Sequence, residues 1–263
     1  MAIEFRNGIR ENLFQLKKYT LFINSKYMPN SNEVIIFIHG LACSSDSFRN
    51  VFDYDYFPTR SLLFIDLIGF GKSSKPDDFS YSIVDQAQLI SELITNLQQK
   101  KIHIVAHSMG GAVALLLPDE ILNRVVSLSN VEGNLIGEDC GLFSRGVIST
   151  PFEKYETELF IRQKEENKNH PQFRFEETTP HAIYKSAESL VKWSDSGELL
   201  KIFQKLSCRK SYFFGEENIN MPVLNRLDSI EKIEIRNSGH AMMTENPEEF
   251  YSKLVDFIDR KLL

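Results

Sequence analysis

Ser108 is the residue whose sequence surroundings most clearly suggest chemistry. It follows an apolar run that ends at Ala106 and His107, and the small residues Gly110 and Gly111 open a second apolar run. A buried strand that delivers a serine to a sharp turn, with a helix leaving the turn, has this order of residue types. The strained turn requires small residues two positions before and after the serine, and Ala106 and Gly110 meet that requirement. Ser108 is therefore a candidate nucleophile; the alternative is an ordinary strand-to-helix turn with an unreactive serine.

A serine hydroxyl becomes an effective nucleophile only when a base removes its proton, so Ser108 requires a histidine within hydrogen-bond reach. Of the six histidines, His240 directly follows a strand-like run near the C-terminus, which makes it the candidate base. His39 and His107 lie beside the motifs around the serine, where we expect them to shape the backbone. The other histidines are expected to be structural or solvent-facing: His103, His170 and His181.

Strands and helices must position these residues, and the hydrophobic pattern indicates where they lie. Loose alternation over residues 14–28 predicts an antiparallel hairpin at the sheet edge. Residues 82–97 have the start signals and apolar spacing of a helix packed on a sheet, and Asn246 with Pro247 begins a similar terminal helix. Further apolar runs predict buried strands, which are residues 34–38, 61–66, 102–106, 125–131, 211–214 and 230–235.

The pattern changes between residues 133 and 206. Charges crowd residues 153–168, aromatic residues are scattered through the segment, and the Thr-Pro pair at 179–180 signals a helix start. The segment is too long for a simple connection, so we expect a helical cap. Most of its aromatic residues should form the cap's own core, with roughly one in three facing a substrate. Trp193 and Phe160 are the aromatic residues that we expect to set substrate choice.

Four stretches resemble, in chain order, the motifs of the α/β-hydrolase superfamily. They are HGLACSSDSF (His39 to Phe48), DLIGFGKSS (Asp66 to Ser74), AHSMGG (Ala106 to Gly111) and SGHAMMTENPEEF (Ser238 to Phe250). The resemblance implies an α/β fold with a mostly parallel eight-stranded sheet flanked by helices and a helical cap inserted after the sixth strand. It divides the chain into a core of residues 1–132 and 207–263 and a cap of residues 133–206. Asp66 then forms a turn for the glycines that follow it.

The same resemblance implies acyl-transfer chemistry. The family stabilises the oxyanion with the N–H of the residue after the nucleophile and with one from the loop after the third strand, here Met109 and Leu41. Each such donor is worth about 3 kcal/mol in the transition state. The turn that carries Ser108 between a strand and a helix is called the nucleophile elbow. A serine at the elbow argues against dehalogenases and epoxide hydrolases, which use an aspartate there. We therefore predict a carboxylesterase-like hydrolase that cleaves an ester or thioester of a small, largely apolar substrate through an acyl-enzyme.

Two other functions are compatible with these motifs. A carbon–carbon bond hydrolase of the meta-cleavage type has the same catalytic triad. A hydrolase-like protein that binds a small ligand with vestigial turnover is the alternative from another class, because a fold alone does not determine a function. The presence of both Ser108 and His240 favours an enzyme, since a pure binding protein does not need the pair.

The acid of the triad has two candidate positions. In most members of the family it follows the seventh strand, and that segment here is residues 215–218, with Asn218 where an aspartate is expected. Some branches place the acid at the end of the sixth strand, which is Glu132 here. We favour Glu132, because a buried acid beside a histidine has a function and a buried unpaired acid is costly. The alternative is that Asn218 or Glu217 orients His240.

Composition excludes several other classes. A chain of 263 residues is long enough for one α/β domain with an insertion. Its net charge of −6 provides no basic surplus for nucleic acid. Charged residues interrupt the apolar stretches near Met1, and no apolar run could span a bilayer, so we expect a cytoplasmic protein with a small-molecule substrate. The unpatterned cysteines Cys43, Cys140 and Cys208 suggest reduced thiols without a metal or cofactor. Cys43 lies just past the oxyanion loop and could line the pocket, but we favour a role as apolar filler.

Overall fold

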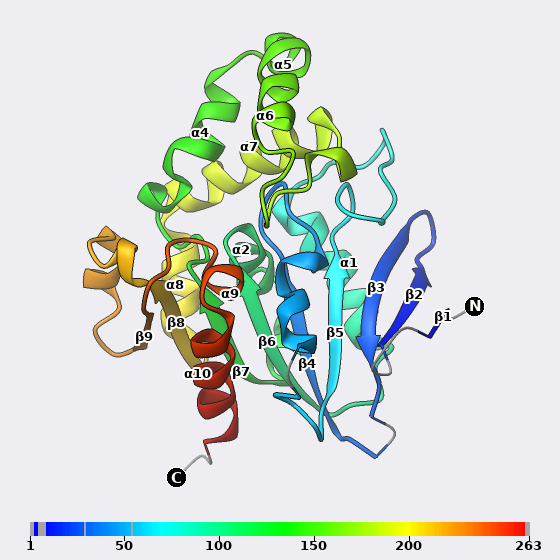
Figure 1. The fold of residues 1–263 in the computed structure, drawn as a ribbon, viewed down its shortest axis with the longest axis vertical. Helices are drawn as coiled ribbons and strands as arrows, with labels where there is room; N and C mark the ends of the chain where they lie inside the picture. The colour runs from blue at the N-terminus through cyan, green and yellow to red at the C-terminus, as the bar shows by residue number, and fades with distance from the viewer. Residues whose placement is uncertain (1–2, 5–8, 29, 54, 261–263) are drawn as a thin grey trace.

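The structure is a computed structural model that describes residues 3–4, 9–28, 30–53 and 55–260. Its framework is a single sheet (Figure 1). In their order across the sheet, the strands are β1 (Ile3–Glu4), β2 (Ile9–Gln15), β3 (Thr20–Lys26), β5 (Ser61–Asp66), β4 (Glu33–Ile38), β6 (Lys101–His107), β7 (Val125–Val131), β8 (Arg209–Gly215) and β9 (Glu231–Ile235).

The sheet has the predicted mixture of strand directions. Strands β2 and β3 form an antiparallel hairpin at the sheet edge, as expected, but it spans residues 9–26 and so begins five residues before the predicted range of 14–28. Strand β3 also pairs antiparallel with β5. From β5 to β9 each strand pairs in parallel with its neighbour. The eight predicted strands are β2 to β9, and the two-residue β1 pairs with β2 at the edge. The mostly parallel eight-stranded sheet is therefore confirmed, with one short strand added.

Helices cover both faces of the sheet, as expected when parallel strands are apolar on both sides (Figure 1). One face carries α1 (Ile83–Thr95), α2 (Met109–Leu115), α3 (Asp119–Leu122) and α8 (Glu198–Lys205). The other carries the 3-10 helix η2 (Ser45–Phe52), α9 (Met242–Glu245) and α10 (Pro247–Asp259). The predicted start signals hold, since the Ser82 hydroxyl accepts a hydrogen bond from the Asp85 N–H at 3.1 Å.

After β7 the chain leaves the sheet and forms the cap, which lies beyond the carboxyl ends of the parallel strands (Figure 1). Its longest helix begins as predicted, because Thr179 Oγ1 accepts from the Ala182 N–H at 3.1 Å and Pro180 is the first helical residue. The cap elements are η3 (Gly137–Cys140), α4 (Gly141–Ser149), α5 (Phe152–Lys154), the π-helix η4 (Tyr155–Leu159), α6 (Phe160–Glu166), η5 (Phe175–Glu177) and α7 (Pro180–Ser196).

Helix α8 brings the chain back to the sheet and packs against α2. The assignment of residues 133–206 to a cap and of residues 1–132 and 207–263 to the core stays a prediction. Among the described residues, no helix has both the length and the apolar character needed to cross a membrane.

Candidate active site

Ser108 lies at the sharp turn between β6 and α2. Its backbone has φ 52° and ψ −121°, a strained conformation that residues with a side chain seldom adopt. The Ser108 N–H donates to Val131 O at 3.0 Å, and Ser108 O accepts from the N–H groups of Gly111 at 2.9 Å and Asn134 at 3.3 Å. These bonds join the elbow to the segment after β7 and hold the serine in its strained conformation.

Close packing explains two glycines near the elbow. A Cβ atom at Gly110 would lie 2.4 Å from Ile38 O, and one at Gly40 would lie 3.0 Å from Ser108 Cβ. Neither position can carry a larger residue without a shift of its neighbours. The sequence predicts a small residue at position 110 because of Ala106, whereas the nearest neighbour in the structure is the end of β4.

Glu132 lies directly after β7, and its carboxylate faces His240. The Oε2 atom of Glu132 accepts a hydrogen bond from Nδ1 of His240 at 2.7 Å. The Glu132 side chain is 1% exposed, whereas that of His240 is 47% exposed. Because a carboxylate accepts here, Nδ1 carries the proton, and the other ring nitrogen, Nε2, has a free lone pair with which to act as a base.

The two candidate positions for the acid converge on the same carboxylate. Asn218 Nδ2 lies 2.9 Å from Oε1 and 3.0 Å from Oε2 of Glu132, and the Gly215 N–H donates to Oε1 at 2.8 Å. These donors compensate the buried carboxylate for the water that it loses. Glu217 instead lies next to the backbone of Ser238 and Gly239. Among the described carboxylates, Glu132 is the one bonded to His240.

The two histidines beside the motifs are buried and hold backbone groups. Nδ1 of His39 bonds to Gly40 O at 2.7 Å, and Nε2 of His39 accepts from the Leu67 N–H at 3.0 Å. Nε2 of His107 lies 3.0 Å from His240 O. Burial lowers the pKa of His39, and burial together with the neighbouring His240 holds the pKa of His107 well below its usual range. Both rings are therefore neutral at neutral pH.

Two backbone amides flank the serine at the positions that the motifs indicate. Leu41 follows β4 in the loop beside Ser108, and Met109 is the first residue of α2. Within the described residues, neither N–H group has a hydrogen-bond acceptor. An N–H at the start of a helix attracts negative charge. Both amides are therefore available to an oxyanion.

A cavity of about 320 Å³ has Ser108, His240 and Glu132 in its wall. The cap supplies the aromatic side chains Phe143 and Phe173, whose rings stack with centroids 5.5 Å apart. The apolar and sulfur-containing part of the wall consists of Leu41, Cys43, Cys140, Phe143, Phe173 and Met221. Further polar groups in the wall include Asn134, Ser144, Gln172 and Asn218.

The sequence predicts the wrong aromatic residues for this wall. Phe160 packs against Phe175 with ring centroids 5.9 Å apart, and Trp193 packs against the core that cap and sheet share. Gln172 also lies in this wall, in an irregular segment whose sequence contains no motif that would mark it. Only its position in the fold identifies it.

Cys43 lines the cavity as a neutral thiol. Burial raises its pKa to about 12, and its Sγ donates to Leu41 O at 3.3 Å. It therefore supplies apolar surface and is not a second nucleophile. Asp66 has the expected structural role, since it accepts from the backbone N–H groups of Ser45 and Lys72 at 2.7 and 2.8 Å. Among the described residues, no group of histidine, cysteine and acidic side chains could hold a metal ion.

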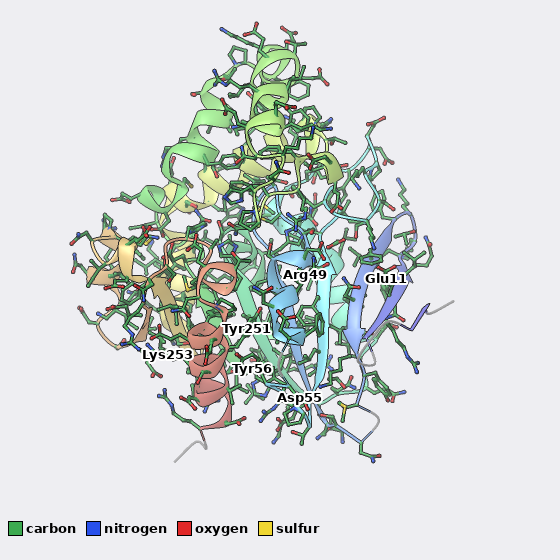
Figure 2. The ribbon with its side chains drawn as sticks, in the orientation of Figure 1. Glu11, Arg49, Asp55, Tyr56, Tyr251 and Lys253 are labelled. Carbon is green, nitrogen blue, oxygen red and sulfur yellow. The ribbon has the colours of Figure 1, made fainter. Side chains whose placement is uncertain are left out.

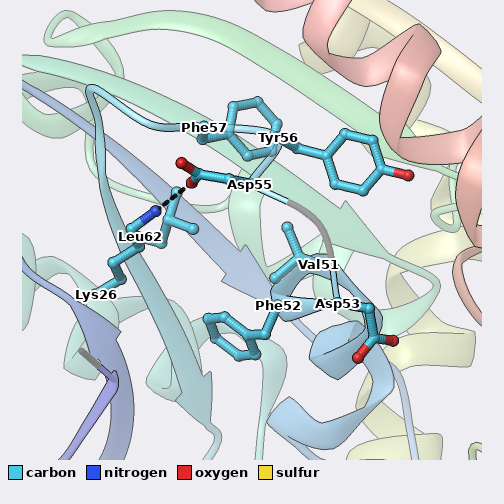
Figure 3. A pocket seen from close by; sticks show the side chains of 8 residues that line it. All are labelled: Lys26, Val51, Phe52, Asp53, Asp55, Tyr56, Phe57 and Leu62. Atoms are coloured by element: carbon cyan, nitrogen blue, oxygen red, sulfur yellow. Dashed lines mark hydrogen bonds and ion pairs between the residues drawn. The ribbon is translucent and has the colours of Figure 1, made fainter. Parts of the chain in front are cut away.

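A second cavity, of about 360 Å³, lies at the end of the molecule away from the cap (Figures 2 and 3). Figure 3 shows Asp55 pointing toward Lys26, with their charged atoms 2.6 Å apart. Phe52, Phe57 and Leu62 line the same cavity. Lys26 in this wall is paired with Asp55, and none of the described lining residues is a serine or cysteine beside a histidine. The cavity at Ser108 is therefore the candidate active site.

Comparisons with known proteins agree with this fold. A family model described as "alpha/beta hydrolase fold" matches residues 33–164, half of the chain. The probable lysophospholipase BODYGUARD 4 of Arabidopsis thaliana is 38% identical over 116 residues, which are 40% of this chain and 28% of that protein. The match thus spans less than a third of that relative's length.

Two solved structures show how far the fold is shared. The N-acyl homoserine lactonase AidH has a TM-score of 0.74 at 16% identity over 97% of this chain and 99% of its own. An esterase from Exiguobacterium antarcticum has a TM-score of 0.70 at 16% identity over 95% of this chain and 99% of its own. At these identities the likeness establishes the fold alone.

Proposed function

Because the chain belongs to the α/β-hydrolase fold family, we propose that it is a carboxylesterase-like serine hydrolase that cleaves an ester or thioester of a small, largely apolar substrate. In this proposal Ser108 is the nucleophile, His240 the base and Glu132 the acid that orients the base. The observation that carries the proposal is the 2.7 Å bond between His240 Nδ1 and Glu132 Oε2, in the wall of a cavity that also contains Ser108.

The reaction follows from the protonation states that these contacts impose. Glu132 keeps the proton of neutral His240 on Nδ1, so Nε2 can take the proton of the Ser108 hydroxyl as its oxygen attacks the acyl carbon. The carboxylate then stabilises the imidazolium that forms. The leaving alcohol or thiol takes this proton, and an acyl-enzyme remains on Ser108. Water attacks the acyl-enzyme with His240 again as base, which releases the acid and restores the serine.

Negative charge on the acyl oxygen requires donors, and the N–H groups of Leu41 and Met109 are the candidates. Neither has another acceptor among the described residues. Backbone donors held in place before the reaction contribute about 3 kcal/mol each to the transition state. The close approach of Gly40 to Ser108 keeps the Leu41 loop beside the nucleophile.

The cavity supports a small substrate. Its volume of about 320 Å³ is at the lower end of the range for small-molecule sites, roughly 300–1,000 Å³. Phe143, Phe173 and Met221 provide an apolar surface for an acyl chain. Binding of a short acyl group would bury part of this apolar surface, and each Å² buried would stabilise the complex by about 25 cal/mol.

A series of 4-nitrophenyl esters with acyl chains of increasing length, together with one acyl thioester, tests the proposal. We expect the highest kcat/KM for short chains, and no turnover above background for Ser108→Ala. Ester binding without release of 4-nitrophenol by the unmodified protein would instead identify a ligand-binding protein.

A further inference from the structure

A side chain from the cap segment reaches the elbow. Gln172 lies between α6 and α7, is 3% exposed, and its Nε2 lies 3.2 Å from Nδ1 and 3.4 Å from Nε2 of His107. Its own backbone N–H donates to Nδ1 of His170 at 3.2 Å, which fixes the segment locally. A buried polar contact therefore joins the cap to the residue immediately before Ser108.

The direction of each hydrogen bond at His107 follows from its partners. The carbonyl oxygen of His240 can only accept, so Nε2 of His107, at 3.0 Å, carries the proton. The ring is neutral, because burial and the neighbouring His240 and His39 lower its pKa. Nδ1 is therefore the ring nitrogen that can accept, and it is also the nearer one to the Gln172 amide nitrogen, at 3.2 Å against 3.4 Å for Nε2. The bonds run in one direction, from Gln172 to His107 and from His107 to His240.

This chain of bonds ends on the residue that we propose as the base. The rings of His107 and His240 have centroids 4.6 Å apart and planes inclined at 50°. His240 is thus fixed at two points, since Glu132 holds Nδ1 of its ring and His107 holds its carbonyl oxygen. Because the ring is half exposed, packing alone does not determine its position.

The same cap segment also contacts the loop with the second oxyanion donor. The Arg174 N–H donates to Ala42 O at 2.8 Å, and Ala42 has a φ of 58°, which lies in the left-handed region. Ala42 follows Leu41 directly. The segment therefore contacts the His107 side chain before the nucleophile and the backbone of the Leu41 loop, so its register relative to the core is fixed.

We propose that Gln172 is a positioning residue for the base: by donating to His107, it holds the ring that fixes the His240 carbonyl, and so keeps the His240 imidazole in place in the cavity wall that it shares with Ser108. The inference rests on the proposed function. A positioning role has a different kinetic effect from a role in contacting the substrate. Loss of its amide should lower kcat through His107, whereas loss of a substrate contact made equally in ground state and transition state raises KM.

A double-mutant cycle tests whether Gln172 acts through His107. Gln172→Met keeps the length of the side chain and removes the donor. His107→Phe keeps a planar aromatic ring and removes both ring nitrogens, so neither Gln172 nor the His240 carbonyl has a partner there. With a 4-nitrophenyl ester, we expect Gln172→Met to lower kcat about tenfold, with KM changed less than about twofold. In the His107→Phe background, Gln172→Met should cause no further loss.

The control is Gln204→Met on α8, which removes an exposed amide bonded to Arg226 O at 3.0 Å and should leave kcat unchanged. Two results would overturn the inference: losses of kcat that add in the double variant, or a rise in KM at constant kcat. Absence of turnover in the unmodified protein would reject the proposed function instead.

A further measurement needs neither turnover nor a His107 variant, so it distinguishes a failure of this inference from a failure of the proposed function. Imidazole ¹⁵N NMR at neutral pH should show His107 as the neutral tautomer with its proton on Nε2. Gln172→Met should change the Nδ1 resonance of this ring. A proton on Nδ1, or no response to Gln172→Met, would show that the proposed chain of bonds does not exist.

Discussion

Asn218 donates from Nδ2 to both carboxylate oxygens of Glu132, at 2.9 Å to Oε1 and 3.0 Å to Oε2. The position where the motifs predict the acid thus carries an amide that supports an acid from the neighbouring strand. This is possible because β7 and β8 are parallel neighbours in which Val131 pairs with Phe213. The loops that follow the two strands therefore meet at the same histidine, and the acid could come from either of them.

The first prediction concerns this acid. Glu132→Gln should lower kcat/KM by about 10³-fold or more, because the amide cannot stabilise the imidazolium of His240. It would also place its own donor against Asn218 and the Gly215 N–H. Steady-state kinetics with a 4-nitrophenyl ester measures the loss. Glu217→Gln is the matched control and should stay within about twofold of the unmodified protein; the reverse order of effects would assign the acid to the seventh-strand loop.

The second prediction distinguishes the hydrogen bonds that Asn218 donates to Glu132 from the negative charge that Glu132 itself places beside His240. Asn218→Ala should lower kcat/KM about tenfold, less than Glu132→Gln, because it removes donors from Glu132 but leaves the carboxylate beside His240. Moving the acid with the double change Glu132→Gln and Asn218→Asp should recover part of the activity that Glu132→Gln loses. An inactive double variant with normal thermal stability would mean that the second loop cannot present an acid to His240.

The third prediction concerns the aromatic residues of the cap that line the cavity. Phe143→Ala and Phe173→Ala should each shift the preferred acyl chain to a longer one, because they remove side chains from the cavity wall. The readout is the order of kcat/KM across the ester series. Trp193→Phe serves as the control in the same cap, since Trp193 packs against the shared core. An unchanged order in both alanine variants, or a changed one in the control, would contradict the assigned wall.

The fourth prediction concerns stability and pH. Burial lowers the pKa of His103 to about 4 in the folded protein, against the ordinary 6.5 of an exposed histidine. Between these values the unfolded chain binds a proton that the folded chain does not, so the free energy of unfolding falls as the pH falls, by up to about 1.4 kcal/mol per pH unit. Asp139, with its pKa raised to about 6 by burial, acts in the opposite direction below pH 6.

Urea denaturation between pH 7.5 and pH 5 should therefore show a smaller loss of stability for His103→Gln than for the unmodified protein. Gln is a suitable substitute because it can still bond to the Ser127 hydroxyl, which lies 2.7 Å from Nδ1 of His103. Parallel pH dependences for the two proteins would show that His103 titrates alike in the folded and unfolded states.

Much of the fold could be predicted from local pattern. Continuous apolar runs such as residues 34–38 are typical of strands covered on both faces, and those strands form the parallel sheet. Ser82 and Thr179 cap helices where their side chains precede apolar periodicity. Glu132 could be singled out because the family resemblance implies an acid at the end of the sixth strand in some branches, and counting strands from Ser108 locates that end.

The cap could not be read in the same detail. Which aromatic residues face the cavity depends on how helices pack against one another, and spacing along one helix does not determine that. Phe160 is an aromatic residue of the kind that often lines pockets, but it packs in the cap core against Tyr155 and Phe175. Gln172 lies in an irregular segment, so neither helical nor strand periodicity predicts its burial or its contact with His107.

Phosphonylation tests the central claim, that Ser108 is activated by the pair of His240 and Glu132, most directly. A fluorophosphonate reacts only with an activated serine, so intact-mass and peptide analysis should show a single adduct on Ser108 of the unmodified protein. Ser108→Ala should take up no label, and Glu132→Gln should be labelled more slowly by about 10²-fold or more. An unlabelled native protein, or equal labelling of Ser108→Ala, would contradict the account.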